Sequence, residues 1–220
     1  MKIKKKFSVS FMMLILLVGA GMSGAGLYAE GFNFGVTAQF GAGGLEGSMS
    51  GKTTDFQAVP GGRFGTFCGW DSEAVLGFRG EAFWHHNNGA AWTSGGNGNR
   101  ISFQTVEVPL LLKATFTGWR AVSGKLALLA GPVFNFVPGS INYSCGGFSK
   151  SAKLEPRVFV MGLETGMEYE FGGNNGLTAE FRGGFDFESI IKSTAEDTEL
   201  KRFYFTLGMR FDVGSVLFRK

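Results

Sequence analysis

The sequence is poor in cysteine and proline, and it lacks the composition of a fibrous or disordered protein. Only two Cys and five Pro occur among 220 residues, and the scarcity of Pro argues against a disordered chain. The 36 Gly follow no Gly-X-Y period, so a collagen-like chain is excluded as well. No Pro-rich, Ser-rich or charged linker divides the chain, and we therefore expect one domain after the N-terminal segment.

Outside its N-terminus the chain also lacks a cluster of basic residues. Residues 1–29 contain four of the 21 Lys and Arg and none of the 18 Asp and Glu. The remainder holds 17 basic and 18 acidic residues, a net charge of −1. Nucleic-acid binding needs a patch or stripe of Lys and Arg that neutralises phosphates. The sequence therefore predicts no nucleic-acid partner.

The first residues have the pattern of an export signal. A charged start, Lys2–Lys6, precedes an apolar run over residues 7–22 and then small residues up to Ala29. These are the three regions of a signal peptide. We expect cleavage after Ala29, so that residues 1–29 are the signal peptide and residues 30–220 the mature domain. An uncleaved signal anchor is the alternative, since the run is nearly long enough to span a bilayer.

The remaining sequence is rich in Phe (24) and alternates between apolar and polar residues. No apolar run after Glu30 reaches the ~20 residues of a membrane helix, whereas alternation is the period of a β-strand. In the first segment Phe32, Phe34, Val36, Ala38 and Phe40 share one face. Similar segments span residues 73–84, 106–116, 159–171, 177–188 and 202–211, and two weaker ones span 56–68 and 125–137. The sequence thus predicts eight strands.

The connections between these segments alternate in length. The short ones are residues 69–71, 117–123 and 172–175, and the long, polar ones are residues 41–54, 85–99, 138–155 and 189–200. A bacterial outer-membrane barrel has short periplasmic turns and long outer loops. The alternation therefore favours such a barrel over a soluble sandwich.

The polarity of the two strand faces indicates which face meets lipid. One face is apolar and aromatic, and the other carries charges. A sheet that spans a membrane must close on itself, with its apolar face toward lipid. In a soluble barrel the charged face would point into an apolar interior at a high desolvation cost. We expect the inward charges to form a structural network of ion pairs: Arg63, Arg79, Glu81, Glu107, Lys113, Glu164, Glu168, Glu180, Arg182, Asp186 and Arg210.

The tryptophans support the membrane prediction. Trp70 and Trp119 lie beside short connections, and Trp84 lies at the outer end of its segment. Membrane barrels carry girdles of aromatic residues at the two lipid–water interfaces. We therefore expect these three residues at the interfaces.

One segment carries a resemblance to a known family. Residues 106–116, Val-Glu-Val-Pro-Leu-Leu-Leu-Lys-Ala-Thr-Phe, followed by Gly-Pro-Val-Phe at 131–134, resemble the bacterial outer-membrane β-barrel domain family, which includes eight-stranded barrels of the OmpA, OmpX and OmpW kind. The resemblance covers residues 30–218. It implies the outer membrane as location, its lipid as surroundings and the barrel-assembly machinery as a partner. These chains usually end on an aromatic residue, whereas this one ends Phe218-Arg219-Lys220.

Pro109 needs a special position in a closed barrel. Proline has no N–H, and a closed barrel has no edge strand on which its absence goes unnoticed. We therefore expect either a bulge at Pro109 or a position above the membrane.

The sequence contains few residues that suggest chemistry. His85 and His86 are adjacent, so their side chains diverge, and we expect a solvated loop pair rather than a metal site. His86, Thr93 and Ser94 are close in sequence but lack the spacing of a catalytic triad. The Gly-rich segment 95–99 follows no strand-to-helix transition of the phosphate-binding kind. The sequence predicts no metal, no cofactor and no enzyme.

Three classes of function stay open for an all-β, eight-stranded antiparallel transmembrane barrel. The first is a structural or interaction role, in which the outer loops meet an extracellular ligand. The second, implied by the resemblance to OmpW, is a narrow transporter or channel for small apolar molecules. The third is a lipid-modifying enzyme at the outer rim. The charged inward face favours the first.

Overall fold

A computed structural model describes eleven stretches of the chain: residues 31–49, 52–53, 57–72, 75–94, 97–116, 124–139, 141–145, 148–154, 156–171, 176–191 and 199–214. The predicted signal peptide and its cleavage site at Ala29 lie outside these stretches. Within them, no helix has the length and hydropathy needed to cross a membrane.

Eight long strands form a closed barrel. They are β1 (Phe32–Met49), β3 (Gln57–Asp71), β4 (Leu76–Ser94), β5 (Asn97–Phe116), β6 (Lys125–Phe136), β9 (Phe159–Glu170), β10 (Leu177–Asp186) and β11 (Glu199–Asp212). Each pairs antiparallel with its neighbours around the ring, and β1 closes it by pairing with β11 from Gly35↔Asp212 to Ser48↔Glu199. The prediction of an eight-stranded antiparallel barrel is confirmed.

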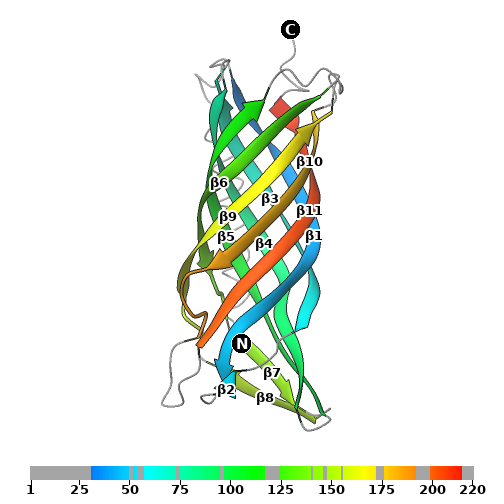
Figure 1. Cartoon of the computed structure of the whole chain (residues 1–220), viewed down its shortest axis with the longest axis vertical. Coiled ribbons are helices and arrows are strands. Elements are labelled where there is room, and N and C mark those ends of the chain that lie inside the picture. Colours follow the sequence, from blue (N-terminus) through cyan, green and yellow to red (C-terminus); the bar gives the residue numbers. More distant parts are fainter. Residues whose placement is uncertain are drawn as a thin grey trace, which may run out of the picture.

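The two ends of the barrel differ (Figure 1). The upper end in Figure 1 is the turn end, where β3 joins β4, β5 joins β6 and β9 joins β10. The lower end is the loop end, and it carries three further short strands, β2 (Lys52–Thr53), β7 (Ile141–Cys145) and β8 (Phe148–Leu154). β7 pairs with the outer part of β5, and β8 pairs with β7.

Three of the four predicted long loops consist mostly of strand. β1 continues to Met49, β4 and β5 continue as a paired hairpin to Ser94 and Asn97, and β7 and β8 occupy most of residues 138–155. The prediction of loops there is wrong because pairing continues past the part of the barrel that alternates in polarity. Glycine and polar residues interrupt the alternation in these segments, so the sequence did not reveal the strands.

Pro109 also differs from its prediction. It pairs with Val133 of β6 without a change of register. The register between β4 and β5 shifts instead between His85 and Asn88. Val108 and Pro109 do not pair with β4. Seven residues separate Pro109 from the turn end of β5, so it lies within the barrel wall and not above it. A short interruption of the ladder accommodates the missing N–H.

The barrel wall separates apolar from charged side chains. Outward residues are strongly exposed, for example Phe40 (73 %) and Leu112 (72 %), while the inward Arg182 has no exposure. Outward and inward residues alternate along each strand as the sequence predicts. A water-soluble protein of this design would expose its apolar side and bury its charges, which is unfavourable on both counts.

Candidate functional site

The lumen holds a set of charged side chains that we call the lumen network. Six are basic and six acidic, so the formal charge of the set is zero, and none is more than 4 % exposed. Its members are Arg63, Arg79, Lys113, Arg182, Arg202, Arg210, Glu81, Glu107, Glu164, Glu168, Glu180 and Asp186. Strand alternation alone brings them together, because every second residue of each strand points inward.

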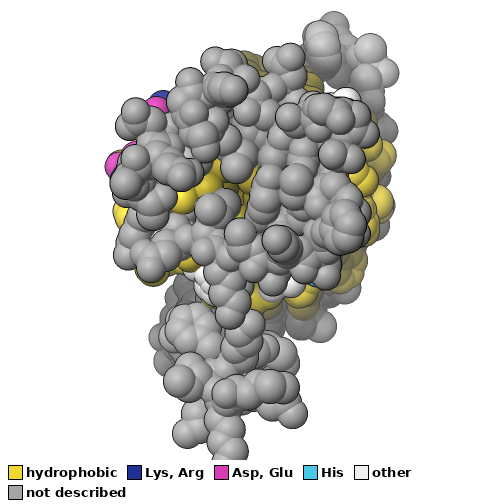
Figure 2. Space-filling view, turned by 90° about the horizontal axis from the view of Figure 1, so that it is seen from below, with side chains coloured by type: hydrophobic (Ala, Val, Ile, Leu, Met, Phe, Trp, Pro, Cys, Tyr) yellow, Lys and Arg dark blue, Asp and Glu magenta, His cyan; other side chains and the backbone are white. Residues whose placement is uncertain are grey.

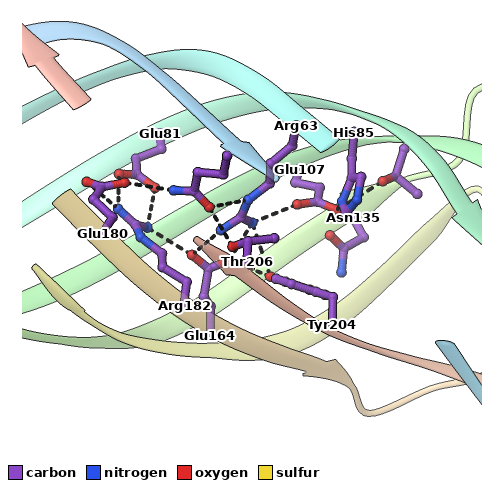
Figure 3. Close-up of polar contacts among 12 residues, drawn as sticks. Arg63, Glu81, His85, Glu107, Asn135, Glu164, Glu180, Arg182, Tyr204 and Thr206 are labelled. Carbon is purple, nitrogen blue, oxygen red and sulfur yellow. Dashed lines mark hydrogen bonds and ion pairs between the residues drawn. The ribbon is translucent and has the colours of Figure 1, made fainter. Parts of the chain in front are cut away.

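Arg182 contacts three carboxylates of the network, those of Glu81, Glu164 and Glu180 (Figure 3). Its two Nη atoms donate to both carboxylate oxygens of Glu81 at 2.6 and 2.7 Å. Nη1 also donates to Glu164 at 2.8 Å, and Nη2 to Glu180 at 3.1 Å. The planar guanidinium group suits such a bidentate contact with a carboxylate. Arg182 on β10 is thereby connected across the lumen to Glu81 on β4.

Arg63 of β3 makes the second crossing of the lumen. Its Nη1 donates to Glu107 at 2.9 Å and to Glu164 at 2.8 Å, and its Nε donates to Gln39 at 2.8 Å. The guanidinium carbon lies 4.3 Å from the centre of the Phe83 ring and 5.0 Å from that of Tyr204. Cations are attracted to aromatic faces, so the two rings hold Arg63 in place without adding charge.

Glu168 organises the turn end of the network. Arg79, Lys113 and Arg210 approach its carboxylate at 2.7, 2.7 and 3.0 Å. Lys113 also bonds Asp71 at 2.9 Å, and Asp71 is one-third exposed. The network therefore reaches the solvent side of the barrel at Asp71.

Glu107 organises the loop end. It accepts bonds from Arg202 and, at 3.0 Å, from Thr105, and His85 Nδ1 lies 2.9 Å from its Oε1. Arg202 also contacts Asp186 at 3.3 Å. Counting Arg63, the Glu107 carboxylate is thus contacted from β3, β4 and β11 as well as from Thr105 on its own strand.

All eleven charged residues that the sequence places in the lumen belong to this connected set. Arg202 completes the network, and the uncharged side chains of Tyr204 and Gln39 bond to it, although the sequence alone did not assign these three residues to the lumen. Tyr204 donates its hydroxyl to Glu164, and its ring lies 4.8 Å from Arg202. Arg202 and Tyr204 share the inward face of β11 with the predicted Arg210, and Gln39 lies on the polar face of the first alternating segment, so the alternation already contained the signal.

The two histidine side chains diverge as predicted, but the prediction that they form a solvated loop pair is wrong. Both lie within β4 and not in a loop. His85 is buried inside the barrel, while His86 is exposed on the outer surface with Nδ1 3.0 Å from the Gln104 amide nitrogen. The strand continues past the segment that alternates clearly, so two adjacent residues point to opposite faces.

The predicted interfacial tryptophans are only partly described. Trp70 is 38 % exposed beside the turn end, with its ring 6.2 Å from that of Phe78. Trp84 is half-buried on β4, which continues ten residues beyond it to Ser94. Trp119 lies outside the described residues.

The lumen network neutralises itself and presents little to a reactant. In the described stretches, no group of three or more His, Cys, Asp or Glu side chains could hold a metal ion. Outside the barrel, His86 contacts a neutral amide, not a carboxylate that could orient it for base catalysis. The side chains of Thr93 and Ser94 are not among those described.

Comparison with known proteins identifies a fold but no family. No protein-family model matches the chain, and no curated protein matches its sequence. The crystal structure of the outer membrane protein OprG from Pseudomonas aeruginosa is similar, with a TM-score of 0.50 and 11 % identity over 82 % of this chain and 93 % of that one. At this identity the likeness shows the barrel fold alone.

Two further solved structures are similar at lower scores. The outer membrane enzyme PagL has a TM-score of 0.46 and 14 % identity, over 81 % of this chain and 99 % of that one. Neisserial surface protein A has a TM-score of 0.44 and 17 % identity, over 83 % and 99 %. Together with the closed ring of eight strands, the likeness to OprG gives the chain the fold of a small outer-membrane barrel.

Proposed function

We propose that the protein is an integral outer-membrane barrel with a closed lumen, a structural or interaction role carried by its loop end, and no enzymatic activity. The observation that carries the proposal is the self-neutralised lumen network inside an apolar outer wall. The outer wall supports the location, and the network supports the closed lumen. OprG, whose fold the chain shares, is itself an outer membrane protein.

The outer wall is suited to lipid on every side. Large exposed apolar residues occur on all eight barrel strands, with Val36, Phe64, Phe78, Leu110, Leu128, Met167, Phe181 and Leu207 as one example from each. A docking site for a protein would concentrate such residues in one patch. An apolar surface that surrounds the molecule fits a bilayer, with outer-membrane lipid as its partner.

The lumen network supports a closed barrel over the alternative of a narrow transporter. Eight strands leave an interior that side chains can fill. Here the large side chains of Arg63, Arg182 and Tyr204 fill that interior. All three donate a hydrogen bond to the carboxylate of Glu164. An apolar molecule that passed between them would have to separate buried ion pairs, which costs several kcal/mol per exposed charge.

The loop end supports an interaction role. The β4–β5 hairpin extends beyond the alternating part of the wall, and β7 and β8 add to its sheet. These strands form the lower end of the molecule in Figure 1. Loops and hairpins at the outer end of a membrane barrel meet the environment, so we place an extracellular ligand there.

Reconstitution tests the proposal directly. Protein refolded into lipid vesicles should migrate as a compact band in gels without boiling and as an extended band after boiling. In planar bilayers the same preparation should give no steady conductance. Stable single channels would contradict the closed lumen, and failure to fold in lipid would contradict the membrane location.

Export is tested by the mass of the protein extracted from outer membranes. We expect a chain that begins at Glu30, because export signals are removed after their small-residue end. A chain that retains residues 1–29 would contradict the signal peptide and leave the barrel proposal to the reconstitution experiment.

A further inference from the structure

A layer of apolar side chains lies inside the barrel at the loop end, beyond the lumen network. We call this layer the apolar stopper. It consists of Leu45, Ile101, Phe103, Val137, Ile141, Val160, Ile190, Ile191 and Leu200, and none is more than 4 % exposed. These residues come from separate parts of the chain but form one buried cluster.

The stopper continues the inward faces that carry the network. On β5 the inward residues change from Glu107 and Thr105 to Phe103 and Ile101. On β11 they change from Arg202 to Leu200, two residues nearer the loop end. The lumen therefore changes from charged to apolar within one step of the strand alternation.

The segment after β10 completes the stopper. Ile190 donates its N–H to Leu200 O at 2.8 Å, and its own carbonyl accepts from Arg157 N at 2.8 Å. Ser189 Oγ accepts from Leu200 N at 3.0 Å and from Ile191 N at 3.3 Å. These bonds hold the backbone of residues 189–191 at the barrel mouth. The side chains of Ile190 and Ile191 are at most 2 % exposed there.

The surroundings make this burial unusual for a barrel mouth. Both isoleucines fall in a connection that the sequence predicts to be polar and solvated, and surface loops rarely bury such residues. In the view onto the loop end, hydrophobic side chains appear along the outer edge and also inside the rim (Figure 2). The apolar residues at this end are therefore not confined to the lipid-facing wall.

We propose that the apolar stopper is a second seal of the barrel, which keeps water out of the loop end independently of the lumen network. The network closes the barrel by filling and neutralising it, whereas the stopper excludes water because hydrating its side chains is unfavourable. The inference rests on the proposed function, in which the loop end of the membrane barrel faces the outside of the cell. It assigns residues 189–191 a sealing role, distinct from ligand contact.

Thiol accessibility tests the seal. In a chain with Cys68→Ala and Cys145→Ser, the change Thr105→Cys places one thiol directly beneath the stopper, next to Phe103 on the inward face. The folded protein in detergent micelles is treated with a small charged methanethiosulfonate. We expect Thr105→Cys to react slowly, and Ile190→Ser/Ile191→Ser to raise the rate by at least about tenfold, because access then needs no opening of an apolar layer.

Two controls isolate the stopper. Phe187→Ser removes an apolar residue of the same segment that is 49 % exposed and lies outside the cluster, and it should leave the rate unchanged. A second reporter, Thr178→Cys, lies near the turn end beside Arg210, and its rate should not respond to the stopper substitutions. Gel mobility before and after boiling verifies that each variant is folded, and Ile190→Ala/Ile191→Ala replaces the serine variant if that one does not fold.

The outcomes separate this inference from the proposed function. Rapid labelling of Thr105→Cys with the stopper intact, or an unchanged rate after its substitution, would overturn the seal. Either result without conductance in planar bilayers would leave the lumen network as the closure. Steady conductance of the unsubstituted protein would instead overturn the closed barrel itself.

Discussion

At the residue scale, the lumen depends on arginines that each serve several carboxylates. Arg182 contacts Glu81, Glu164 and Glu180, and Arg63 contacts Glu107 and Glu164. Removal of one guanidinium therefore leaves more than one buried carboxylate without its counter-charge. Buried ion pairs add little stability when intact, but loss of one partner is costly.

Replacement of Arg182 by Ala should destabilise the barrel by about 3–5 kcal/mol, the usual cost of an uncompensated buried charge. Urea unfolding in lipid vesicles, or the temperature at which the compact gel band is lost, measures the effect. The matched control is Leu110→Val on the lipid-facing wall, which should cost less than about 1.5 kcal/mol. Equal effects of the two changes would mean that the lumen is solvated.

Gly184 is required by its neighbour on the next strand. It pairs directly with Tyr204, and a Cβ at this position would lie 2.5 Å from the Tyr204 hydroxyl. The tyrosine cannot move aside easily, because it donates to Glu164 and its ring contacts both Arg63 and Arg202. Glycine at position 184 thus leaves the space that the Tyr204 side chain occupies.

Gly184→Ala should therefore cost about 1–3 kcal/mol through overpacking, measured by the same unfolding experiment. Gly80→Ala is the control, since a Cβ there meets nothing nearer than Leu110 Cδ2 at 3.6 Å. In the background Tyr204→Ala the penalty of Gly184→Ala should shrink, as expected for residues in contact. A penalty that stays the same would show that the clash is not with Tyr204.

At the element scale, strand alternation allowed most of the barrel to be predicted. The Phe-rich face of β1 and the Glu-rich inward face of β9 identify both the strand and its orientation. The sequence could not reveal the outer half of the β4–β5 hairpin or the β7–β8 pair, because strands outside the bilayer have no lipid to select one apolar face. For the same reason His85 was expected in a loop.

Other features depend on three-dimensional contacts that no local pattern records. The ion-pair partners in the lumen come from strands up to 101 residues apart, as for Arg63 with Glu164. Which acid meets which base is set by barrel register and not by sequence spacing. The apolar stopper was missed because Ile190 and Ile191 lie in a short polar stretch without periodicity.

The orientation of the elements leads to a labelling prediction. An epitope inserted between Gly95 and Gly96, which connect β4 to β5 at the loop end, should bind antibody on intact cells, because hairpin tips tolerate insertion. An epitope between Gly173 and Asn174, which connect β9 to β10 at the turn end, should bind only after permeabilisation. Equal labelling of both epitopes would contradict the orientation.

At the scale of the whole molecule, a closed lumen should make the contribution of its charges to the free energy of unfolding insensitive to salt. A rise in ionic strength from about 0.01 M to 1 M shortens the Debye length from about 30 Å to about 3 Å, but only for charges that ions can reach. The destabilisation caused by Arg182→Ala should therefore be the same at both salt concentrations. A penalty that disappears at high salt would indicate a water-filled pore.

The surface pair Arg157–Glu188 provides the comparison within the same molecule. Both side chains are more than 40 % exposed, so their contribution should be small and lost at high salt. Measuring Arg157→Ala beside Arg182→Ala in one salt series distinguishes a solvated charge from a buried one. The difference in salt dependence between the two substitutions should be the same in every lipid used for refolding.

The closure of the ring by β1 and β11 has a consequence for biogenesis. The first and the last barrel strands of the chain pair with each other, so the strand that completes the barrel is the last to be synthesised. Until it arrives, an incomplete chain has two open edges, which can pair with other chains, and its six acidic lumen residues lack Arg202 and Arg210, which β11 supplies. Such a chain would expose unpaired charges in lipid and apolar side chains in water, so a truncated product should be degraded and not inserted.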